Sequence, residues 1–581
     1  MHRIFPFLRW LPELGQPGVL RADVVAGITV ALILVPQAMA YAELAGLPPV
    51  YGLYAAFLPP AIAALFGSSR QLATGPVAMA SLISATTVQV IVPQGGEAYI
   101  AHSLVLALLV GIIRIGLGAL RLGLLVNLLS SPVVVGFTNA AAFIIATSQL
   151  NKLLGVEAQR GDSHLLMVLH VVDTALSGVH WPTLGMAILA GGLLLAFHRL
   201  MPGMPHMLLT VVITTVASWL GGFSGAVVGE IPRGLPRPVI PLIDVEALPQ
   251  LCLGALTLTL IGLMEAMAIA KTIATQTRQR LDINRELVGQ GMANLVGALF
   301  QSYAVSGSFS RSAINHQSGA RTGFSSVVTS LVVVVTLLWL TPLLYYLPQA
   351  TLAVIIIAAL FSLVQVRPLV TAWRVSVHDG GVGMLTFVGT LLLAPALHLG
   401  IALGVGLALV LNLYRTMRPR VVYLTRHLDG TLRDAEVQGL QPDQQIAIMR
   451  FDGRLYFGAS SFFEDSVLET IVRAPELKFL ILEAEGINQI DASGEQTLRS
   501  VVERLREIGV DLYFTRAKRQ FTDVLERSGS IEYIGRDHFF RWNQHALEYL
   551  WARLDPEYKA RCPLNAPHPR ETGATDAEYY I

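Results

Sequence analysis

The chain has 581 residues, of which 53% are hydrophobic and 14% are charged. This composition excludes a secreted disulfide scaffold, a disordered protein and a simple nucleic-acid-binding protein. Residues 1–420 contain 22 Lys and Arg against 14 Asp and Glu, whereas residues 421–581 contain 19 against 26. The low charge density of the first part predicts a domain that lies in a lipid bilayer, and the second part has the charge density of a soluble domain, about 25%.

The N-terminal residues 1–23 carry three arginines but lack the apolar core and cleavage site of a signal peptide, so we expect a cytoplasmic segment. The two cysteines, Cys252 and Cys562, imply neither a disulfide framework nor a metal site. The sequence contains no Walker loop, metal-ligand spacing or nucleophile elbow. We therefore expect a protein that is not an enzyme, with no catalytic residues, no cofactor and no metal.

Between residues 24 and 420 we expect about fourteen spanning segments, each close to the roughly 20 apolar residues that a bilayer requires. The clear segments are 24–42, 50–66, 99–120, 132–150, 183–199, 205–222, 251–271, 322–341, 343–364, 380–394 and 396–414, and weaker ones are 74–92, 284–300 and a short piece near 309. Residues 164–178 are apolar but contain His170 and Asp173, so we place them at the membrane interface rather than across it. An even number of spans puts both ends of the chain on one side.

The positive charges between these segments are unevenly distributed. With the N-terminus inside, the inner segments hold 17 Lys and Arg, Arg114 among them, against 4 on the outside. This bias predicts that both termini are cytoplasmic. The chain has 5 lysines against 36 arginines, which favours a bacterial source and therefore the inner membrane.

The two weakest helical segments begin with small and polar residues at membrane depth. One starts at Thr74-Gly75-Pro76-Val77-Ala78 and the other at Ser306-Gly307-Ser308-Phe309-Ser310. Lipid cannot satisfy free backbone groups, so such breaks are expected only where they line a cavity. We expect Pro76 in the first turn of one helix and Ser308 or Ser310 as the cap of the other.

The two breaks lie about seven spans apart, so the second enters the membrane from the opposite side. Two half-helix N-termini then face each other near the midplane, where their free N–H groups favour an anion. The alternative interpretation is a pair of Gly/Pro kinks packed between helices.

Two ionisable side chains lie within apolar segments: Glu265, and Arg311 directly after the second break. A charge at bilayer depth costs about 2.5–3.5 kcal/mol even on the more permissive scale, so it is usually paired and functional. We expect Glu265 to pair with Arg311 until an anion competes for the guanidinium and favours the protonated carboxyl. The alternative is a structural salt bridge. Gln37 and Tyr41 share one helical face and offer further hydrogen bonds to a ligand. The alternative for each is a contact between helices.

From about residue 443 short apolar strands alternate with amphipathic helices, which predicts a small α/β domain over 443–553. A linker over 421–442 and a C-terminal tail over 554–581 complete this part. The string Ile490-Asp491-Ala492-Ser493-Gly494 precedes a helix, so Asp491 or Ser493 is expected to cap it. The alternative role for Ser493 is as a regulatory phosphorylation site.

At these residues the chain resembles the sulfate permease (SulP) family, called solute carrier family twenty-six in animals. Pro49-Val50-Tyr51-Gly52-Leu53-Tyr54-Ala55-Ala56 followed by Gly67-Ser68-Ser69-Arg70 is similar to the family signature, although Ala63 departs from it. VPQAMAYA, ATGPVAMAS and SGSFSRSAINHQSGART look like the family's first, third and tenth spans. The resemblance implies an α-helical membrane protein with 14 spans in a seven-plus-seven inverted repeat, with core and gate subdomains and a cytoplasmic STAS domain (sulfate transporter and anti-sigma antagonist).

The resemblance also implies a site and a function. The anion is expected between the third and tenth spans, at Gln37, Tyr41, Val77, Ala78, Phe309, Ser310 and Arg311. Glu265 stands where proton-coupled members carry an acid, and Ser493 where relatives of the STAS domain are phosphorylated. The expected function is secondary active transport of an inorganic oxyanion, and proton–sulfate symport is the favoured form of it. The expected partners are the anion and a proton, a second copy of the chain in a homodimer, and a cytoplasmic protein on the STAS domain, with no nucleic acid.

Other functions remain open from the sequence. Sodium- or proton-coupled transport of bicarbonate or a dicarboxylate uses similar motifs. A nucleobase permease of the same membrane fold is disfavoured, because Arg311 and the soluble domain favour an anion and this family. From another class, the chain could be a membrane-tethered signalling module whose STAS domain binds partners.

Overall fold

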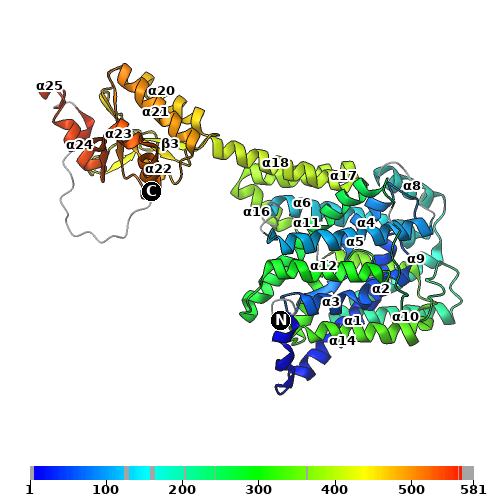
Figure 1. The fold of residues 1–581 in the computed structure, drawn as a ribbon. Coiled ribbons are helices and arrows are strands. Elements are labelled where there is room, and N and C mark those ends of the chain that lie inside the picture. The colour runs from blue at the N-terminus through cyan, green and yellow to red at the C-terminus, as the bar shows by residue number, and fades with distance from the viewer. Residues whose placement is uncertain are drawn as a thin grey trace. The chain divides into compact units, whose positions relative to one another are not determined.

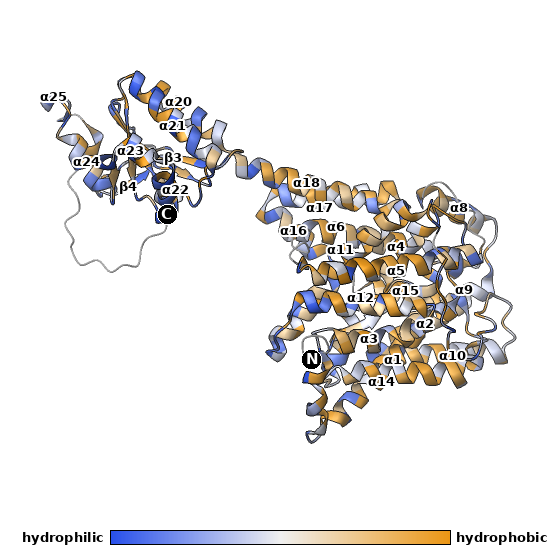
Figure 2. Ribbon diagram, in the orientation of Figure 1, coloured by the Kyte–Doolittle hydropathy of each residue, from blue (hydrophilic) through white to orange (hydrophobic). Residues whose placement is uncertain are grey.

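The structure is a computed structural model that describes residues 6–123, 130–156, 164–201, 205–242, 244–361, 364–559 and 562–565. The chain divides into two compact units, Met1–Ala408 and Leu409–Ile581. The first unit is almost entirely helical and the second is built on a β-sheet (Figure 1). Figure 2 shows apolar residues along most helices of the first unit, whereas hydrophilic residues are frequent in the second.

The membrane unit follows the order of the predicted spans. Its first half contains α1 (Val19–Leu44), α2 (Pro49–Phe57), α3 (Pro59–Phe66), β1 (Ala73–Gly75), α4 (Ala78–Val88), α5 (Glu97–Ala119), α6 (Ser131–Ser148), α7 (Leu150–Leu154), α8 (His164–Ser177), α9 (Trp181–Leu200) and α10 (His206–Leu220). Its second half contains α11 (Leu248–Thr277), α12 (Ile283–Leu299), β2 (Ser306–Ser308), α13 (Phe309–Gln317), α14 (Phe324–Val335), α15 (Gln349–Leu360), α16 (Val366–Val375), α17 (Val377–Leu393) and α18 (Leu397–Met417). Two 3₁₀ turns, η1 (Pro6–Arg9) and η2 (Leu11–Gly15), precede α1, which begins at Val19 rather than at the predicted residue 24.

These helices have the length and surface of membrane spans. In the described part of the chain, 8 helical segments are long and apolar enough to cross a bilayer, and α4, α8, α10, α15 and α17 are shorter apolar helices. Large apolar side chains remain exposed on them, such as Ile188 at 67% and Leu392 at 72%. A water-soluble protein rarely exposes contiguous apolar surface on this scale, so the first unit is an integral membrane domain.

The helices separate into two packed groups, the core and the gate. In the core, α5 packs on α11 and α12, and α1 packs on α2 and α14. In the gate, α17 packs on α6 and α16, and α9 packs on α10 and α15. Helix α1 joins the groups through α10 and α15, and Glu43 at its end forms a 2.5 Å ion pair with Lys152 of α7. Each group takes helices from both halves of the chain, as expected for an inverted repeat.

The second unit is a six-stranded sheet in the order β4-β3-β5-β6-β7-β8. Its strands are β3 (Arg420–Arg426), β4 (Leu432–Asp434), β5 (Ile446–Asp452), β6 (Phe479–Glu483), β7 (Asp511–Thr515) and β8 (Phe539–Phe540), parallel from β5 to β8 and antiparallel at β3 and β4. Its helices are α19 (Ala435–Gln438), α20 (Ser460–Arg473), α21 (Ala492–Glu507), α22 (Arg519–Ser528), α23 (Ser530–Ile534), α24 (Asn543–Trp551) and α25 (Pro556–Lys559). The predicted alternation of strands and helices is present.

The structure differs from our expectation at both edges of this unit. Residues 421–442, predicted as a linker, supply β3, β4 and α19, because Val422 and Leu424 are buried when β3 pairs with β5. In the predicted tail, Cys562 and Leu564 are buried in the same apolar cluster. Both segments are too short and too rich in charge to be recognised as core elements from their own pattern.

Candidate functional site

The two predicted breaks form one structure at the centre of the core. Strands β1 and β2 pair antiparallel, with Ala73 opposite Ser308, Thr74 opposite Gly307 and Gly75 opposite Ser306. Helix α4 begins three residues after Gly75, and α13 begins directly after Ser308. The prediction of two interrupted segments that meet is therefore confirmed, and neither segment is a continuous spanning helix.

The strand pair satisfies backbone groups that lipid would leave unpaired. Ser312 Oγ accepts a 2.8 Å hydrogen bond from the N–H of Ala73 and donates at 2.6 Å to the carbonyl of Ser308. The side chain of Asn294 on α12 makes two hydrogen bonds to the backbone of Val305. It accepts from the N–H at 2.9 Å and donates to the carbonyl at 3.0 Å. The breaks are thus held by polar side chains of neighbouring helices, which keeps the strand pair in one geometry.

The N-termini of the two half-helices differ. Ser308 caps α13 by accepting a hydrogen bond from the N–H of Arg311, so one of the two predicted caps is present. Among the described residues, no side chain caps α4, whose preceding residue Val77 is extended. Pro76 lies before α4 and not in its first turn, because the helix begins only after the extended residue Val77. The N–H groups of the first turn of α4 therefore have no side-chain cap among the described residues.

Arg311 extends from α13 to the opposite break. Its side chain is 1% exposed, and Nη2 donates at 2.7 Å to the carbonyl of Pro76. Nη1 donates at 3.4 Å to Oε1 of Gln37 on α1, whose amide nitrogen contacts Met207 of α10 at 3.3 Å. Nε of Arg311 is buried and lacks a hydrogen-bond partner in the described part of the chain.

The other predicted site residues surround this arginine. Tyr41, Val77 and Ala78 are buried in the apolar cluster of the core. Phe309 is 49% exposed and Ser310 is partly exposed. Other side chains therefore do not fully cover the first two residues of α13. Tyr303 is a further buried residue near the site, and no pattern in the sequence indicates it. It precedes β2, and its hydroxyl lies 3.0 Å from Oγ of Ser81 on α4.

Glu265 lies near the site but does not form the expected pair. It is in the middle of α11, partly exposed, and it interacts electrostatically with Arg311. No ion pair within 4.0 Å joins the two side chains in the described structure, since the guanidinium is instead directed to Pro76 and Gln37. The expected direct contact between Glu265 and Arg311 is therefore not formed in this conformation.

Three further charged side chains are buried in the helices, although their sequence positions suggested loops. Arg114, counted with the inner loops, lies within α5 and is 1% exposed. Glu286 of α12 accepts hydrogen bonds at 2.8 Å from the N–H groups of both Ser68 and Ser69. Asp23 of α1 accepts from the N–H of Arg321 at 2.7 Å. Their position near the ends of apolar segments made them look like loop charges.

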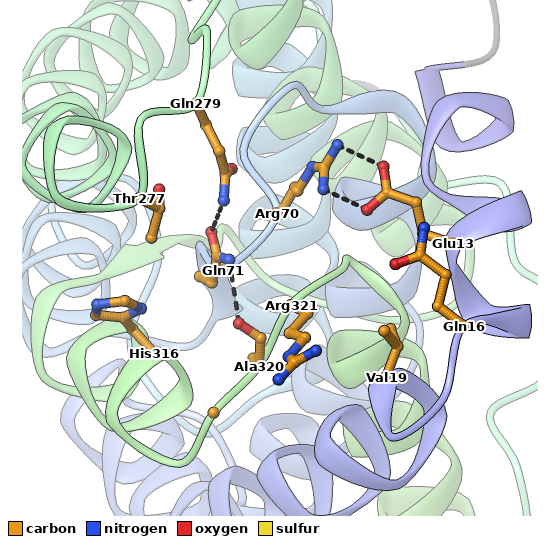
Figure 3. A pocket seen from close by; sticks show the side chains of 11 residues that line it. Glu13, Gln16, Val19, Arg70, Gln71, Thr277, Gln279, His316, Ala320 and Arg321 are labelled. Carbon is orange, nitrogen blue, oxygen red and sulfur yellow. Dashed lines mark hydrogen bonds and ion pairs between the residues drawn. The ribbon is translucent and has the colours of Figure 1, made fainter.

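A cavity of about 400 Å³ lies beside the residues that precede β1 (Figure 3). Glu13 of η2 forms a bidentate ion pair with Arg70, at 2.6 and 2.8 Å. Gln71 accepts from the side chain of Gln279 at 3.1 Å and donates to the carbonyl of Ala320 at 3.1 Å, as Figure 3 shows. The N-terminal segment is therefore fastened to the chain that enters β1.

In the soluble unit, Asp491 is the cap of α21. Its Oδ1 accepts from the N–H of Gly494 at 2.8 Å, and its Oδ2 accepts from the N–H of Phe457 at 3.0 Å. Ser493 is exposed in the first turn of this helix. The described residues contain no group of three or more His, Cys, Asp or Glu arranged to hold a metal ion.

Comparisons with known proteins agree with this architecture. Residues 20–386 match the model of the sulfate permease family, and residues 440–545 match the STAS domain. Sulfate transporter 4.1, chloroplastic, of Arabidopsis thaliana is 34% identical over 566 residues, which cover 92% of this chain and 81% of that protein. The structure of murine Solute Carrier 26 family member A9, an anion transporter in the inward-facing state, superposes with a TM-score of 0.87 at 24% identity and covers 94% of each chain.

A further solved structure is similar to the membrane unit alone. The transmembrane domain of a cyanobacterial bicarbonate transporter, BicA, superposes with a TM-score of 0.59 at 25% identity, covering 68% of this chain and 98% of that one. The fold of the chain is thus shared with one solved anion transporter, and the fold of its membrane unit with a solved bicarbonate transporter domain. The chain belongs to the sulfate permease family, whose members are membrane transporters and not enzymes.

Proposed function

We propose that this chain carries an inorganic oxyanion into the cell together with a proton, and that sulfate is the favoured substrate. The observation that carries the proposal is Arg311, a buried guanidinium that joins α13 to the break before α4. Its unpartnered Nε and the uncapped N-terminus of α4 provide donors from both half-helices. A fixed guanidinium fork and helix N-termini are groups that bind tetrahedral oxyanions in proteins.

The expected site consists of the residues that surround these donors. They are Gln37, Tyr41, Val77, Ala78, Phe309, Ser310 and Arg311. Gln37 contributes an amide next to the guanidinium, and the exposure of Phe309 leaves a route to the front of α13. Sulfate is favoured as the substrate because the similar plant proteins are sulfate transporters by name.

Proton coupling is assigned to Glu265. Its carboxylate interacts electrostatically with Arg311 and forms no ion pair with it in the described structure. A bound anion repels a nearby carboxylate, and protonation of Glu265 removes that repulsion. Anion and proton are then bound together and released together, which is symport.

The proposal also includes the membrane in which the chain lies, the side of its termini and its binding partners. The positive-inside bias supports cytoplasmic termini, and the arginine-rich composition supports a bacterial inner membrane. A homodimer and a cytoplasmic partner for the STAS domain are further parts of the proposal. Ser493, exposed in the first turn of α21, is accessible for regulatory phosphorylation.

Uptake into proteoliposomes tests this function. The purified chain should accumulate labelled sulfate when the outside is acidic, and an imposed sodium gradient should have no effect. Sulfate that enters equally well against the proton gradient contradicts symport. Sodium-driven uptake of bicarbonate or a dicarboxylate would favour the second candidate, which the likeness to a bicarbonate transporter supports.

The signalling alternative is tested with the same assay. A truncated chain that lacks residues 420–581, which include all strands of the soluble sheet, should still carry sulfate if transport is the primary role. A full-length protein that moves none of these anions, yet captures a partner through its STAS domain, would favour the signalling module.

A further inference from the structure

A second buried arginine lies behind the strand pair. Arg114 of α5 is 1% exposed, and its guanidinium bridges two elements of the core. Nη1 donates at 3.1 Å to the carbonyl of Val305, the residue before β2. Nη2 donates at 3.1 Å to the carbonyl of Leu258 on α11, the helix that carries Glu265. Arg114 thus holds β2 at a fixed position relative to the proposed proton acceptor.

Gly262 makes room for this contact. A Cβ atom at Gly262 would lie 2.6 Å from Nη2 of Arg114 and 2.6 Å from Oγ of Ser306. Ser306 also donates at 2.9 Å to the carbonyl of Gly262. The guanidinium therefore lies immediately beside the first residue of β2.

The two buried arginines lie close to the same pair of residues. Ser306, beside Arg114, is opposite Gly75 in the strand pair. A Cβ atom at Gly75 would lie 3.5 Å from Nη2 of Arg311. Both guanidinium groups therefore lie close to the β1–β2 pair, after which the two half-helices begin.

The charge of Arg114 is not neutralised locally. No carboxylate of the described residues lies within 4.0 Å of its guanidinium, and its Nε is buried without a hydrogen-bond partner there. A neutral side chain such as Gln can donate to a carbonyl without the large desolvation cost of a buried charge. The two hydrogen bonds alone therefore do not require a cation at this position.

The geometry points to Arg114 as a specificity-determining and positioning residue of the transport site, whose charge favours dianions over monoanions. This inference rests on the proposed function. A fixed charge in a medium of low dielectric constant stabilises a dianion about twice as strongly as a monoanion at the same position. The charge of Arg114 acts through space from behind the strand pair, so the guanidinium does not need to touch the anion. The ligand class is a tetrahedral dianion such as sulfate.

Equilibrium binding of sulfate and of nitrate to the purified full-length protein tests the inference. The R114Q variant should lose preference for sulfate over nitrate by about tenfold, because one unit charge near the site is removed. R114K keeps the charge and should retain the preference to within about threefold, although it cannot bond both carbonyls. R199Q, which removes an exposed arginine of the gate helix α9, is the matched control and should behave as the wild type.

Several outcomes would overturn the inference. An unchanged preference in R114Q, or an equal loss in R114K and R114Q, would reduce Arg114 to a structural clamp. If R114Q is not recovered as a monodisperse protein, R114K keeps the inference falsifiable, because a loss of about tenfold in the sulfate preference of a variant that retains the charge would contradict it. A wild-type protein that binds no sulfate would instead refute the proposed function, so the two failures are distinguishable.

Discussion

Arg311 donates a 2.7 Å hydrogen bond to the carbonyl of Pro76, a residue 235 positions away in the sequence. This hydrogen bond joins the two halves of the inverted repeat next to the β1–β2 pair, after which α4 and α13 begin. The same guanidinium reaches Gln37 of α1. Three elements therefore meet at one buried cation, and the proposed anion site depends on its position.

Replacement of Arg311 by Lys should abolish most transport. Lysine keeps the charge but cannot reach Pro76 and Gln37 with a planar fork, so the donors lose their fixed orientation. Since a hydrogen bond to a charged group contributes about 1.5–3 kcal/mol, we expect sulfate affinity to fall about 10–100-fold. Binding and uptake are measured on the same preparation. Uptake at the wild-type rate in R311K would show that the anion binds elsewhere.

Glu265→Gln should separate anion binding from proton coupling. The neutral amide resembles the protonated carboxyl, so the variant should bind sulfate at least as well as the wild type. Sulfate exchange should persist, but net uptake should no longer respond to an imposed pH gradient. Full pH-driven accumulation by E265Q would exclude Glu265 as the coupling acid, and Glu286→Gln serves as the comparison at a second buried carboxyl.

The packing of α1 on α2 should tolerate no side chain at Gly52. A Cβ atom there would lie 1.9 Å from the carbonyl oxygen of Ala38, which follows Gln37 in the proposed site. Overpacking of this kind costs about 1–3 kcal/mol, so G52A should lower the temperature of unfolding. G116A in α5 is the control, because nothing lies within 4 Å of a Cβ at that position. Equal unfolding temperatures for G52A and G116A would contradict the predicted packing.

The soluble unit should protect Cys562 from modification. Burial, and to a lesser extent a hydrogen bond to Asp443, raise the pKa of the Cys562 thiol to about 12. The folded protein therefore holds far less reactive thiolate at about pH 8 than an unfolded chain, whose thiol has a pKa of about 8.5. In a Cys252→Ala background, iodoacetamide should label Cys562 only after denaturant is added. Rapid labelling under native conditions would show that residues 562–565 are not packed against the sheet.

Much of the fold was predictable because its signals are long and periodic. Apolar runs located the spans, and alternating strands and helices located the soluble domain. The breaks at Thr74-Gly75 and Ser306-Gly307 were recognisable because small polar residues are unusual at membrane depth. Arg311 was recognisable for the same reason.

What the sequence did not predict depends on contacts between distant segments. Arg114 was assigned to a loop because its bonds to Val305 and Leu258 exist only after α5 packs on α11. Tyr303 has no local pattern that indicates its contact with Ser81. Strand β3 is not recognisable from its own pattern, because it is stabilised by pairing with β4 and β5, and a short segment alone carries little of that signal.

The most direct measurement is an experimental structure of the full-length protein in selenate, a tetrahedral dianion that resembles sulfate and scatters X-rays anomalously. We predict one anomalous peak between the N-termini of α4 and α13, within hydrogen-bond distance of the Arg311 guanidinium. A transport-competent protein whose selenate lies away from this arginine, or whose β1–β2 pair is replaced by continuous helices, would contradict the account.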